Sequence, residues 1–392
     1  MRYHAVVIGA GLVGAACALA LEKQGLQVAM VELRPPSEPA PDWDSRVYAI
    51  SPGSQALLER LGAWGRMDAS RLQAVYRMDV FGDGAGALRL DAYDSGEERL
   101  ATILESNRLQ WALWQAARQA LNLELISPAQ VGSLHLGQPQ SRLMLEDGRE
   151  LEAELIIGAD GRDSWVRAQA DLRPLIEPYG QLGVVANFAV GKPHHGTAFQ
   201  WFRGDGVLAW LPLSGDRISM VWSTAAEHGQ ELLALDEQAL CVSVAEAGRN
   251  RLGGLSLLTP AVGFPLQLIK LAEIYKPGLV LIGDAAHGVH PLAGQGVNLG
   301  FGDVDSLTAL LENRGRASCG DVRLLATHAR ARAEPVSRMQ TVTDNLHHLF
   351  ARGDKFSGTL RNAGMSLLNR LPVTKSALVR EAMGITDQGV NL

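Results

Sequence analysis

The sequence predicts an α/β fold in which a parallel nucleotide-binding sheet is interrupted by an antiparallel insertion and followed by helices. Three observations predict it: an apolar run before a glycine-rich turn at the start of the chain, successive short strands over 182–223, and helical periodicity after Asp303. A chain of 392 residues is long enough for more than one domain. We therefore expect a nucleotide domain from 1–70, 101–170 and 277–345, a β-rich domain from 71–100 and 171–276, and a helical segment at 346–392.

Each element of the nucleotide domain follows from a local pattern. The apolar run His4–Ile8 predicts a buried strand, and Ala15–Gln24 predicts a helix that Gly25 ends. Gln27–Val31 predicts the second parallel strand, because it is short, apolar and follows the helix closely. Further helices are expected at Ser54–Leu61 and Asn107–Ala120, and further strands at Leu123–Ile126, Ser133–Leu136, Arg142–Glu146 and Leu155–Ile157. In the expected β-rich domain, Tyr76–Phe81 and Leu88–Leu90 alternate around a Gly/Asp turn, as in a hairpin.

The pattern changes in the second half of the chain. Turns rich in Gly, Pro and Asp separate successive strands there, which predicts an antiparallel sheet. The expected strands are Val184–Val190, Thr197–Phe202, Val207–Pro212 and Ile218–Trp222. One helix is expected over Gln230–Ala247, and Leu279–Ile282 returns to the parallel-strand pattern. Three tryptophans on the sheet either belong to its core or line an apolar pocket, and both alternatives stay open: Trp201, Trp210 and Trp222.

The composition argues against several classes of function. A net charge of −6 gives no electrostatic reason to expect a nucleic-acid partner. Cys17, Cys241 and Cys319 are far apart and odd in number, so they form no metal or disulfide pattern, which fits a reducing compartment. Glycines interrupt the apolar stretch Ala5–Leu21, which favours strand, turn and helix over a signal peptide. We expect a cytoplasmic protein without a resident metal; peripheral contact with the inner membrane and homo-oligomer formation stay open.

The turn Gly9–Gly14 matches the dinucleotide pattern G-x-G-x-x-G of Rossmann-type domains. Gly9 permits the tight turn, Gly11 lets a pyrophosphate approach, and Gly14 lets the helix pack on the strand. Leu12 and Val13 complete the set of residues expected to bind the cofactor here. The alternative is a glycine-rich turn without a ligand, but a strand before the turn and a helix after it favour the nucleotide.

Glu32 strengthens this interpretation. It ends the second strand at nearly the expected distance of about 20 residues after the turn, where a carboxylate accepts hydrogen bonds from adenosine ribose hydroxyls. A carboxylate there repels a 2′-phosphate, which argues against NADP as the ligand of this turn. The motif does not distinguish NAD from FAD.

Two later segments also follow predicted strands. In the first, Gly158–Arg167, the Asp160-Gly161 pair is by itself a common turn. The second, Gly283–Asp303, is rich in glycine, and Asp284 stands at the end of its strand, where open α/β sheets bind ligands. Its glycines lead into a helix start, where free N–H groups attract an electron-rich partner.

Together the three motifs resemble the flavin-dependent aromatic hydroxylases of the para-hydroxybenzoate hydroxylase type. Within that class, the block His290–Gly300 looks like the ubiquinone-biosynthesis hydroxylases of the UbiH/UbiF/VisC group. The stretches Asp44–Ser51 and Leu378–Gly384 are similar to the same group. The resemblance covers essentially the whole chain and implies a Rossmann-type FAD-binding domain, an inserted antiparallel-sheet substrate domain and C-terminal helices.

The resemblance assigns expected roles to matching positions. It implies that Glu32 binds the adenosine ribose, that Arg46 lies near the flavin and pyrophosphate, and that Arg108 holds the adenosine-diphosphate half. Asp160 belongs to a motif that supports FAD and transient NAD(P)H docking. Gly283 and Asp284 are expected at the ribityl chain or its neighbouring phosphate.

The resemblance places the reactive ring beside the segment Gly294–Asn298. Gly294, Gly296, Val297 and Asn298 are the residues expected to line the isoalloxazine. The Pro291 carbonyl is the expected substrate-side group, and Pro291, Gly294 and Gln295 form the expected catalytic set. His287 and His290 could suggest a metal, but they lie in a glycine/proline loop without a carboxylate or cysteine, so a backbone-positioning role is favoured.

The implied reaction is hydroxylation of a polyprenylated phenol or quinol in ubiquinone biosynthesis, with NAD(P)H as electron donor and O₂ trapped as a flavin hydroperoxide. Because the cofactor supplies that chemistry, neither a catalytic triad nor a metal cluster is needed. Membership of a ubiquinone-biosynthesis complex is an expected association. Two alternatives stay open: an FAD-dependent hydroxylase of a small soluble aromatic, and a non-catalytic flavoprotein subunit of such a complex.

The arginines of Arg323–Arg338 are expected on a solvated helix face. They are Arg323, Arg330, Arg332 and Arg338. Binding to an acidic membrane surface or to a partner protein is the alternative for this face.

Overall fold

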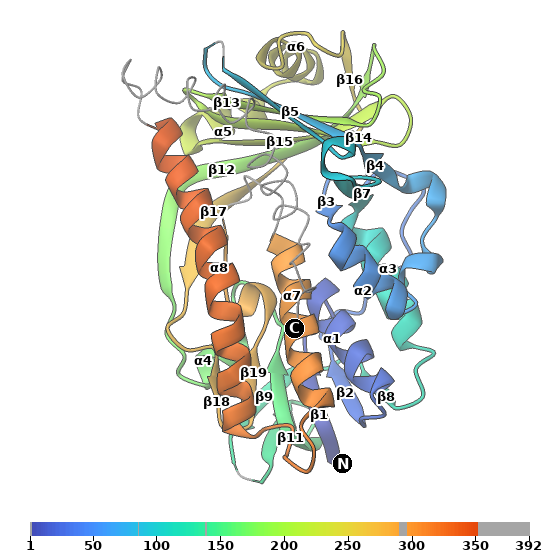
Figure 1. Ribbon diagram of the computed structural model, residues 1–392, viewed down its shortest axis with the longest axis vertical. Helices are drawn as coiled ribbons and strands as arrows, with labels where there is room; N and C mark the ends of the chain where they lie inside the picture. The colour runs from blue at the N-terminus through green and yellow to red at the C-terminus, as the bar shows by residue number, and fades with distance from the viewer. Residues whose placement is uncertain (1, 85, 138, 290–295, 352–392) are drawn as a thin grey trace.

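The computed structural model describes residues 2–84, 86–137, 139–289 and 296–351, and it contains two large sheets. In Figure 1 the parallel sheet lies in the lower half of the molecule and the antiparallel sheet lies across the top. Helix α8 (Val322–Ala351) runs along one side between the two levels, and α7 (Gly296–Glu312) lies beside it. This architecture confirms the predicted α/β class with an antiparallel insertion.

The parallel sheet has the strand order β18-β19-β11-β1-β2-β8. Its strands are β1 (Arg2–Ile8), β2 (Val28–Val31), β8 (Leu123–Ile126), β11 (Glu150–Gly158), β18 (Tyr275–Lys276) and β19 (Leu279–Leu281). All neighbours are parallel except β18, which is antiparallel to β19. β9 (Val131–His135) and β10 (Ser141–Leu145) extend it as an antiparallel pair beside β11.

Both faces of the parallel sheet are buried. On β1, Ala5 and Val7 belong to the core beneath α1 (Leu12–Lys23) and α7, whereas Val6 and Ile8 belong to the core on the opposite face. Two-sided burial explains why β1 is continuously apolar rather than alternating. The local apolar runs therefore predicted β1, β2, β8, β11 and β19, but not β18.

The antiparallel sheet has the order β16-β12-β15-β14-β13-β5-β6, with β17 also paired to β12. Its strands are β5 (Arg77–Phe81), β6 (Ala87–Asp91), β12 (Leu175–Val190), β13 (Thr197–Arg203), β14 (Gly206–Leu213), β15 (Arg217–Ala225), β16 (Leu255–Leu257) and β17 (Val262–Lys270). Only the β13–β5 pair is parallel. The strands predicted from turn spacing are thus confirmed, with β12 extending further towards the N-terminus than expected.

The tryptophans belong to the core of this sheet. Trp201, Trp210 and Trp222 pack with Leu240 and Val244 of α6 (Glu237–Ala247). Residues alternate along a strand, so the opposite face of the sheet is the one turned towards the nucleotide domain. Of the two alternatives open in the sequence, the core position is the correct one.

Smaller elements join the two sheets. A three-stranded sheet in the order β3-β7-β4 lies beside α2 and α3. The elements are β3 (Val47–Ile50), β4 (Gln73–Val75), β7 (Ala101–Glu105), α2 (Pro52–Arg60), α3 (Ser106–Ala117), α4 (Trp165–Gln169), α5 (Ala226–Ala234) and the short 3₁₀ turns η1 (Trp64–Arg66), η2 (Ala69–Arg71), η3 (Tyr93–Ser95) and η4 (Gly283–Ala285). The sequence did not predict β3, β4, β7, β16, β17 or β18, or the short helix α4.

Two expectations about helices were wrong. The single helix expected over Gln230–Ala247 is divided into α5 and α6, because the Asp236 side chain accepts from the Ala239 N–H and starts a new helix. Helix α7 begins at Gly296, earlier than the helical pattern suggested. The similarity over Leu378–Gly384 lies outside the described residues. Within the described ranges, no helix is long and apolar enough to cross a membrane.

Candidate cofactor site

The dinucleotide turn has the shape that its glycines predict. Gly9 has a φ of +101°, and a Cβ there would lie 2.5 Å from the Ala159 carbonyl oxygen. A Cβ on Gly14 would overlap the Gly9 carbonyl, so helix and strand pack closely at this point. A Cβ on Gly11, by contrast, would have no heavy atom of the described residues within 4 Å. The open space at the start of α1 fits a pyrophosphate on free helix N–H groups.

Glu32 is fixed beside this turn. Its Oε2 accepts from the Ala10 N–H at 2.7 Å, and its Oε1 accepts from the Arg34 N–H at 2.9 Å. A carboxylate has about four acceptor positions, so these two bonds leave room for ribose hydroxyls. Leu12 is buried in α1. Val13 lies against Gly283 and Gly300, and so joins the first motif to the third.

The η4 turn points one carboxylate outwards. Asp284 is exposed, whereas Gly283, Ala285 and Ala286 on either side of it are buried. The turn follows β19 directly, with Gly283 at a φ of +60°. Asp284 therefore stands where a ligand at the carboxyl ends of the parallel strands would meet it.

Tyr48 is a residue of this region that the sequence did not predict. The Arg46 guanidinium lies 5.5 Å from the Tyr48 ring centroid. Burial raises the pKa of Tyr48, Arg46 opposes that rise, and the Asp284 carboxylate adds to it. Arg46 and Tyr48 therefore lie side by side at the start of β3.

Asp303 is a buried carboxylate beneath the η4 turn. Its Oδ2 accepts from the Gly283 N–H at 2.9 Å and lies 2.7 Å from His287 Nε2. Its Oδ1 accepts from Arg332 Nε at 2.7 Å. Burial alone raises the pKa of Asp303, but His287, Arg332 and the Gly283 N–H outweigh it and hold the carboxyl ionised. The Arg332 side chain is 12% exposed, so the expectation of a solvated position was wrong for this arginine.

His287 has a buried partner. Burial lowers the pKa of His287, but the Asp303 carboxylate outweighs burial and the net direction is upwards. This contact agrees with the positioning role that the sequence favoured. Across the described ranges, no three His, Cys, Asp or Glu side chains gather as a metal cluster would.

A second buried carboxylate, Glu105, fixes the segment that carries Arg46. Arg71 donates through Nε and Nη2 to both of its oxygens at 2.7 Å, and Arg108 donates through Nε at 2.9 Å. Glu105 Oε1 also accepts from the Asp44 N–H at 2.8 Å. Arg108 is therefore anchored beside this segment, close to Arg46 in the fold.

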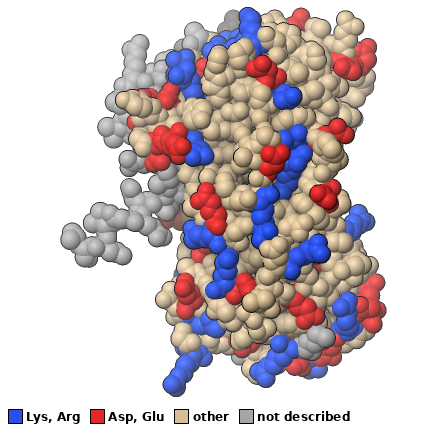
Figure 2. Space-filling model, turned by 90° about the vertical axis from the view of Figure 1, so that its right-hand side faces the viewer, with Lys and Arg blue, Asp and Glu red and all other residues tan. Residues whose placement is uncertain are grey.

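These buried ion pairs differ from the pairs on the surface. On the face that carries α2 and α3, basic side chains form a broken line flanked by acidic ones (Figure 2). The Arg60–Asp305 pair is 2.6 Å long, but its side chains are 60% and 46% exposed. Solvent screens such a pair, so it contributes at most about 1 kcal/mol. The Glu105 side chain, in contrast, is fully buried.

Asp160 stabilises the turn in which it lies. One of its oxygens accepts from the Ser164 hydroxyl and the other from the Val166 N–H. Arg167, which is buried, donates to the Ala285 carbonyl at 3.0 Å and links the second motif to the third. The geometry gives Asp160 a local structural contact, and its expected role in docking stays a prediction.

The first turn of α7 is tied to β3 and α2. Asn298 Oδ1 accepts from the Ser51 N–H at 3.1 Å, and its Nδ2 donates to the Ala49 carbonyl at 2.9 Å. Gly296 is the first residue of α7, and Val297 is buried. Four expected residues lie outside the described ones: His290, Pro291, Gly294 and Gln295.

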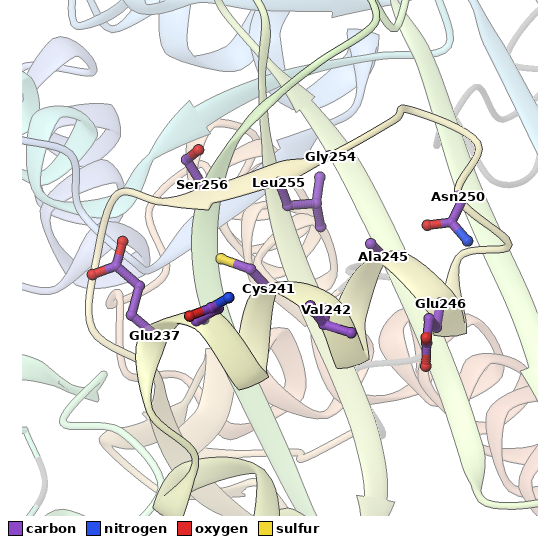
Figure 3. A pocket seen from close by; sticks show the side chains of 10 residues that line it. Glu237, Cys241, Val242, Ala245, Glu246, Asn250, Gly254, Leu255 and Ser256 are labelled. Atoms are coloured by element: carbon purple, nitrogen blue, oxygen red, sulfur yellow. The ribbon is translucent and has the colours of Figure 1, made fainter.

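A cavity of about 590 Å³ lies elsewhere, between α6 and β16. In Figure 3 the Cys241 thiol points into the gap between helix and strand, with Leu255 opposite. Burial raises the pKa of this thiol, which makes it a poor nucleophile. None of the lining residues belongs to the three motifs, so this cavity is separate from the candidate cofactor site.

Three distant segments thus form one cradle: the turn at Gly11, the carboxylate Glu32 and the η4 turn around Asp284. A family model described as an FAD binding domain matches residues 2–343. The 3-demethoxyubiquinol 3-hydroxylase of Escherichia coli is 32% identical over 387 residues, which cover 97% of this chain and 98% of the relative. The chain belongs to the FAD-dependent hydroxylases of ubiquinone biosynthesis.

Other comparisons agree with this assignment. The mitochondrial ubiquinone biosynthesis monooxygenase COQ6 of Drosophila melanogaster is 30% identical to the hydroxylase, over 98% of this chain and 90% of the relative. The solved structure of p-nitrophenol 4-monooxygenase PnpA from Pseudomonas putida is 17% identical with a TM-score of 0.78, and the match covers 98% of each chain. That likeness shows the fold. The hydroxylase is therefore an FAD-dependent monooxygenase, and the predicted cofactor is confirmed.

Proposed function

We propose that this hydroxylase adds an oxygen atom from O₂ to the aromatic ring of a polyprenylated phenol or quinol, with NAD(P)H as the electron donor. The observation that carries the proposal is the similarity to curated ubiquinone-biosynthesis hydroxylases along almost the whole chain. The converging motifs support it, because they form one extended cradle rather than separate nucleotide and substrate sites.

Different residues of this cradle would bind different parts of the cofactor. Gly11 and the start of α1 would hold the pyrophosphate, and Glu32 the adenosine ribose. Asp284 would bind the ribityl chain or the neighbouring phosphate, with Arg46 close by. FAD supplies the redox and oxygen chemistry when bound, and the protein supplies orientation and exclusion of water.

The remaining expected residues complete the proposed site. Arg108 would hold the adenosine-diphosphate half, and Asp160 would support docking of NAD(P)H. Gly294, Gly296, Val297 and Asn298 would line the ring, and the Pro291 carbonyl would face the substrate. Pro291, Gly294 and Gln295 would form the catalytic set.

The ring of the substrate would bind between the cofactor and the inner face of the antiparallel sheet. On the outer face, the tryptophans pack against α6 and form a core. On the inner face, Val185 of β12 stands opposite Val221 of β15, and Asn187 stands opposite Ser219. Asn187 and Ser219 are fully buried, so the partly exposed Val221 is the one of these residues that the ring would reach.

A polyprenyl tail keeps such a substrate in a membrane. We propose that the protein works from the cytoplasm and meets its substrate at the inner-membrane surface, alone or within a ubiquinone-biosynthesis complex. Co-sedimentation of purified protein with liposomes that contain the substrate tests this contact. Recovery of the protein in the supernatant at every lipid concentration would contradict direct docking.

Two experiments test the function. Purified protein should be yellow with a flavin absorption band, and colourless protein that takes up no FAD would contradict the cofactor assignment. A deletion strain should lose ubiquinone and accumulate a precursor that lacks one ring hydroxyl, detected by mass spectrometry. Normal ubiquinone would instead indicate a small soluble aromatic substrate.

A third experiment distinguishes an enzyme from a non-catalytic flavoprotein subunit. The purified hydroxylase is given its accumulated precursor, NADH or NADPH, and ¹⁸O₂. We expect the substrate to accelerate NAD(P)H oxidation and the product to contain one ¹⁸O atom. Absence of both, with FAD bound, would favour the non-catalytic role.

A further inference from the structure

Arg332 of α8 reaches into the nucleotide domain and ends against α7. Its Nε donates to Asp303 Oδ1 at 2.7 Å, and its Nη2 donates to the Leu299 carbonyl oxygen at 3.0 Å. The Asp303 side chain is 2% exposed, so the ion pair lies where salt and solvent screen it weakly. One planar guanidinium thus bonds two successive turns of α7.

Gly302 explains how the guanidinium fits. A Cβ on Gly302 would lie 2.9 Å from Arg332 Nη2 and 3.2 Å from its Cζ. The guanidinium therefore lies directly against the bare backbone of α7. A methyl group at this position would displace it without changing any charge.

Asp303 transmits this contact to the η4 turn. Its second oxygen accepts from the Gly283 N–H and contacts His287 Nε2, as described above. Gly283 directly precedes Asp284, and His287 follows Asp284 by three positions; Asp284 itself is exposed. The guanidinium of Arg332 is thus connected both to the turn that carries Asp284 and to the first turn of α7.

We propose that Arg332 is a positioning residue of the FAD site. Acting through Asp303 and the Leu299 carbonyl, it fixes the η4 turn relative to the start of α7, the two segments between which FAD would extend. A binding site made of two segments holds its ligand well only when their relative placement is fixed beforehand. Helix α8, although distant from the dinucleotide turn, is then a part of the cofactor site.

The chain supplies a matched control. Arg330 lies on the same helix two positions earlier, is exposed, and donates to Thr327 Oγ1 on its own helix. Arg330→Gln therefore removes the same charge from α8 without affecting Asp303. Gly302→Ala perturbs the contact by volume alone, and Arg332→Lys keeps the charge but loses the planar fork.

The test measures FAD binding by full-length protein stripped of its flavin and shown by circular dichroism to be folded. We expect Arg332→Gln to raise the Kd for FAD about 10-fold or more, the range for a lost charged hydrogen bond. Gly302→Ala should have a similar effect, Arg332→Lys a smaller one, and Arg330→Gln a change below about twofold. The midpoint potential of the bound flavin should shift in the same order, because α7 would start at a different position beside the ring.

Two outcomes overturn the proposal. The first is an unchanged Kd and midpoint potential in folded Arg332→Gln, even with a lower Tm, because a merely structural residue would change stability alone. The second is an equal loss of FAD affinity in Arg330→Gln. If Arg332→Gln does not fold, the two milder variants provide the test. The proposal is then overturned when Gly302→Ala and Arg332→Lys both bind FAD with the wild-type Kd.

Discussion

Asn187 of the antiparallel sheet donates from Nδ2 to the Asp44 carbonyl oxygen at 2.7 Å. This bond joins the inner face of the substrate sheet to the segment that carries Arg46. It crosses between the two halves of the molecule, since Asp44 is in turn bonded to Glu105 and to the Asn107 N–H. The sheet expected to bind substrate and a segment expected near the flavin are thus in direct contact.

We predict that Asn187→Asp destabilises the protein more than Asn187→Leu. Aspartate would place a buried carboxylate against a carbonyl oxygen, whereas leucine removes the donor and also removes Asn187 Oδ1, which has no partner among the described residues. The expected losses in free energy of unfolding are about 1 kcal/mol for leucine and about 3 kcal/mol for aspartate. Urea denaturation of both variants measures the difference, and equal losses would contradict this account.

Gly11 and Gly14 should respond differently to alanine. In Gly11→Ala the methyl enters open space, so we expect the flavin-free protein to keep its Tm while FAD affinity falls about 10-fold. In Gly14→Ala the methyl overlaps the Gly9 carbonyl, so the flavin-free protein should lose about 2 kcal/mol or more. Thermal unfolding and fluorescence titration with FAD separate the two effects. Wild-type FAD affinity in Gly11→Ala would rule out a pyrophosphate at this position.

Replacing Glu105 should be costly. Glu105→Gln leaves Arg71 and Arg108 without their buried carboxylate, and we expect a loss of about 3 kcal/mol in the free energy of unfolding. Arg60→Gln is the control, because it breaks only the exposed pair with Asp305 and should cost below about 1 kcal/mol. Both values come from urea denaturation at neutral pH. A loss in Glu105→Gln no larger than the control would show that solvent reaches the pair.

His328 should make the protein sensitive to acid. Burial lowers the pKa of His328 from 6.5 to about 4, with Arg332 and His287 acting in the same direction and Asp303 opposing them. A folded pKa below the unfolded one means that its contribution is present above pH 6.5 and is lost as the pH falls towards 4. The contribution is on the order of 3 kcal/mol.

The variant His328→Leu removes this titration. We expect its free energy of unfolding to fall less steeply than that of the wild type between pH 6.5 and 4, whatever its absolute stability. Urea denaturation at several pH values gives the two slopes. Parallel slopes would show that imidazole protonation at this position is not coupled to unfolding.

Local sequence patterns predicted the features that depend on residues close together in the chain. The first strand, the turn at Gly9–Gly14 and the acidic residue Glu32 lie within one βαβ unit, so their spacing carried the information. The boundary between α5 and α6 could also have been predicted from the sequence. Asp236 can start a helix, because its side chain accepts from the Ala239 N–H three residues later. The expectation of one helix missed it because apolar residues continue on both sides.

Contacts between distant segments could not be predicted in this way. Arg332 resembles the other arginines of α8 in sequence, and only the packing of α8 against α7 brings it to Asp303. The strand β17 contains Pro265, and a proline within a strand argues against one unless the strand lies at an edge. Its pairing with β12 became visible only in the sheet.

The order of the cradle along the chain has a consequence for synthesis. The turn at Gly11 is made early, whereas β19, the η4 turn and α7 come after the whole antiparallel sheet. A ribosome releases the N-terminal part first, so the cradle stays incomplete until most of the chain has emerged. If FAD binds in this cradle as proposed, its tight capture must wait until the Gly11 turn has packed against the η4 turn and α7.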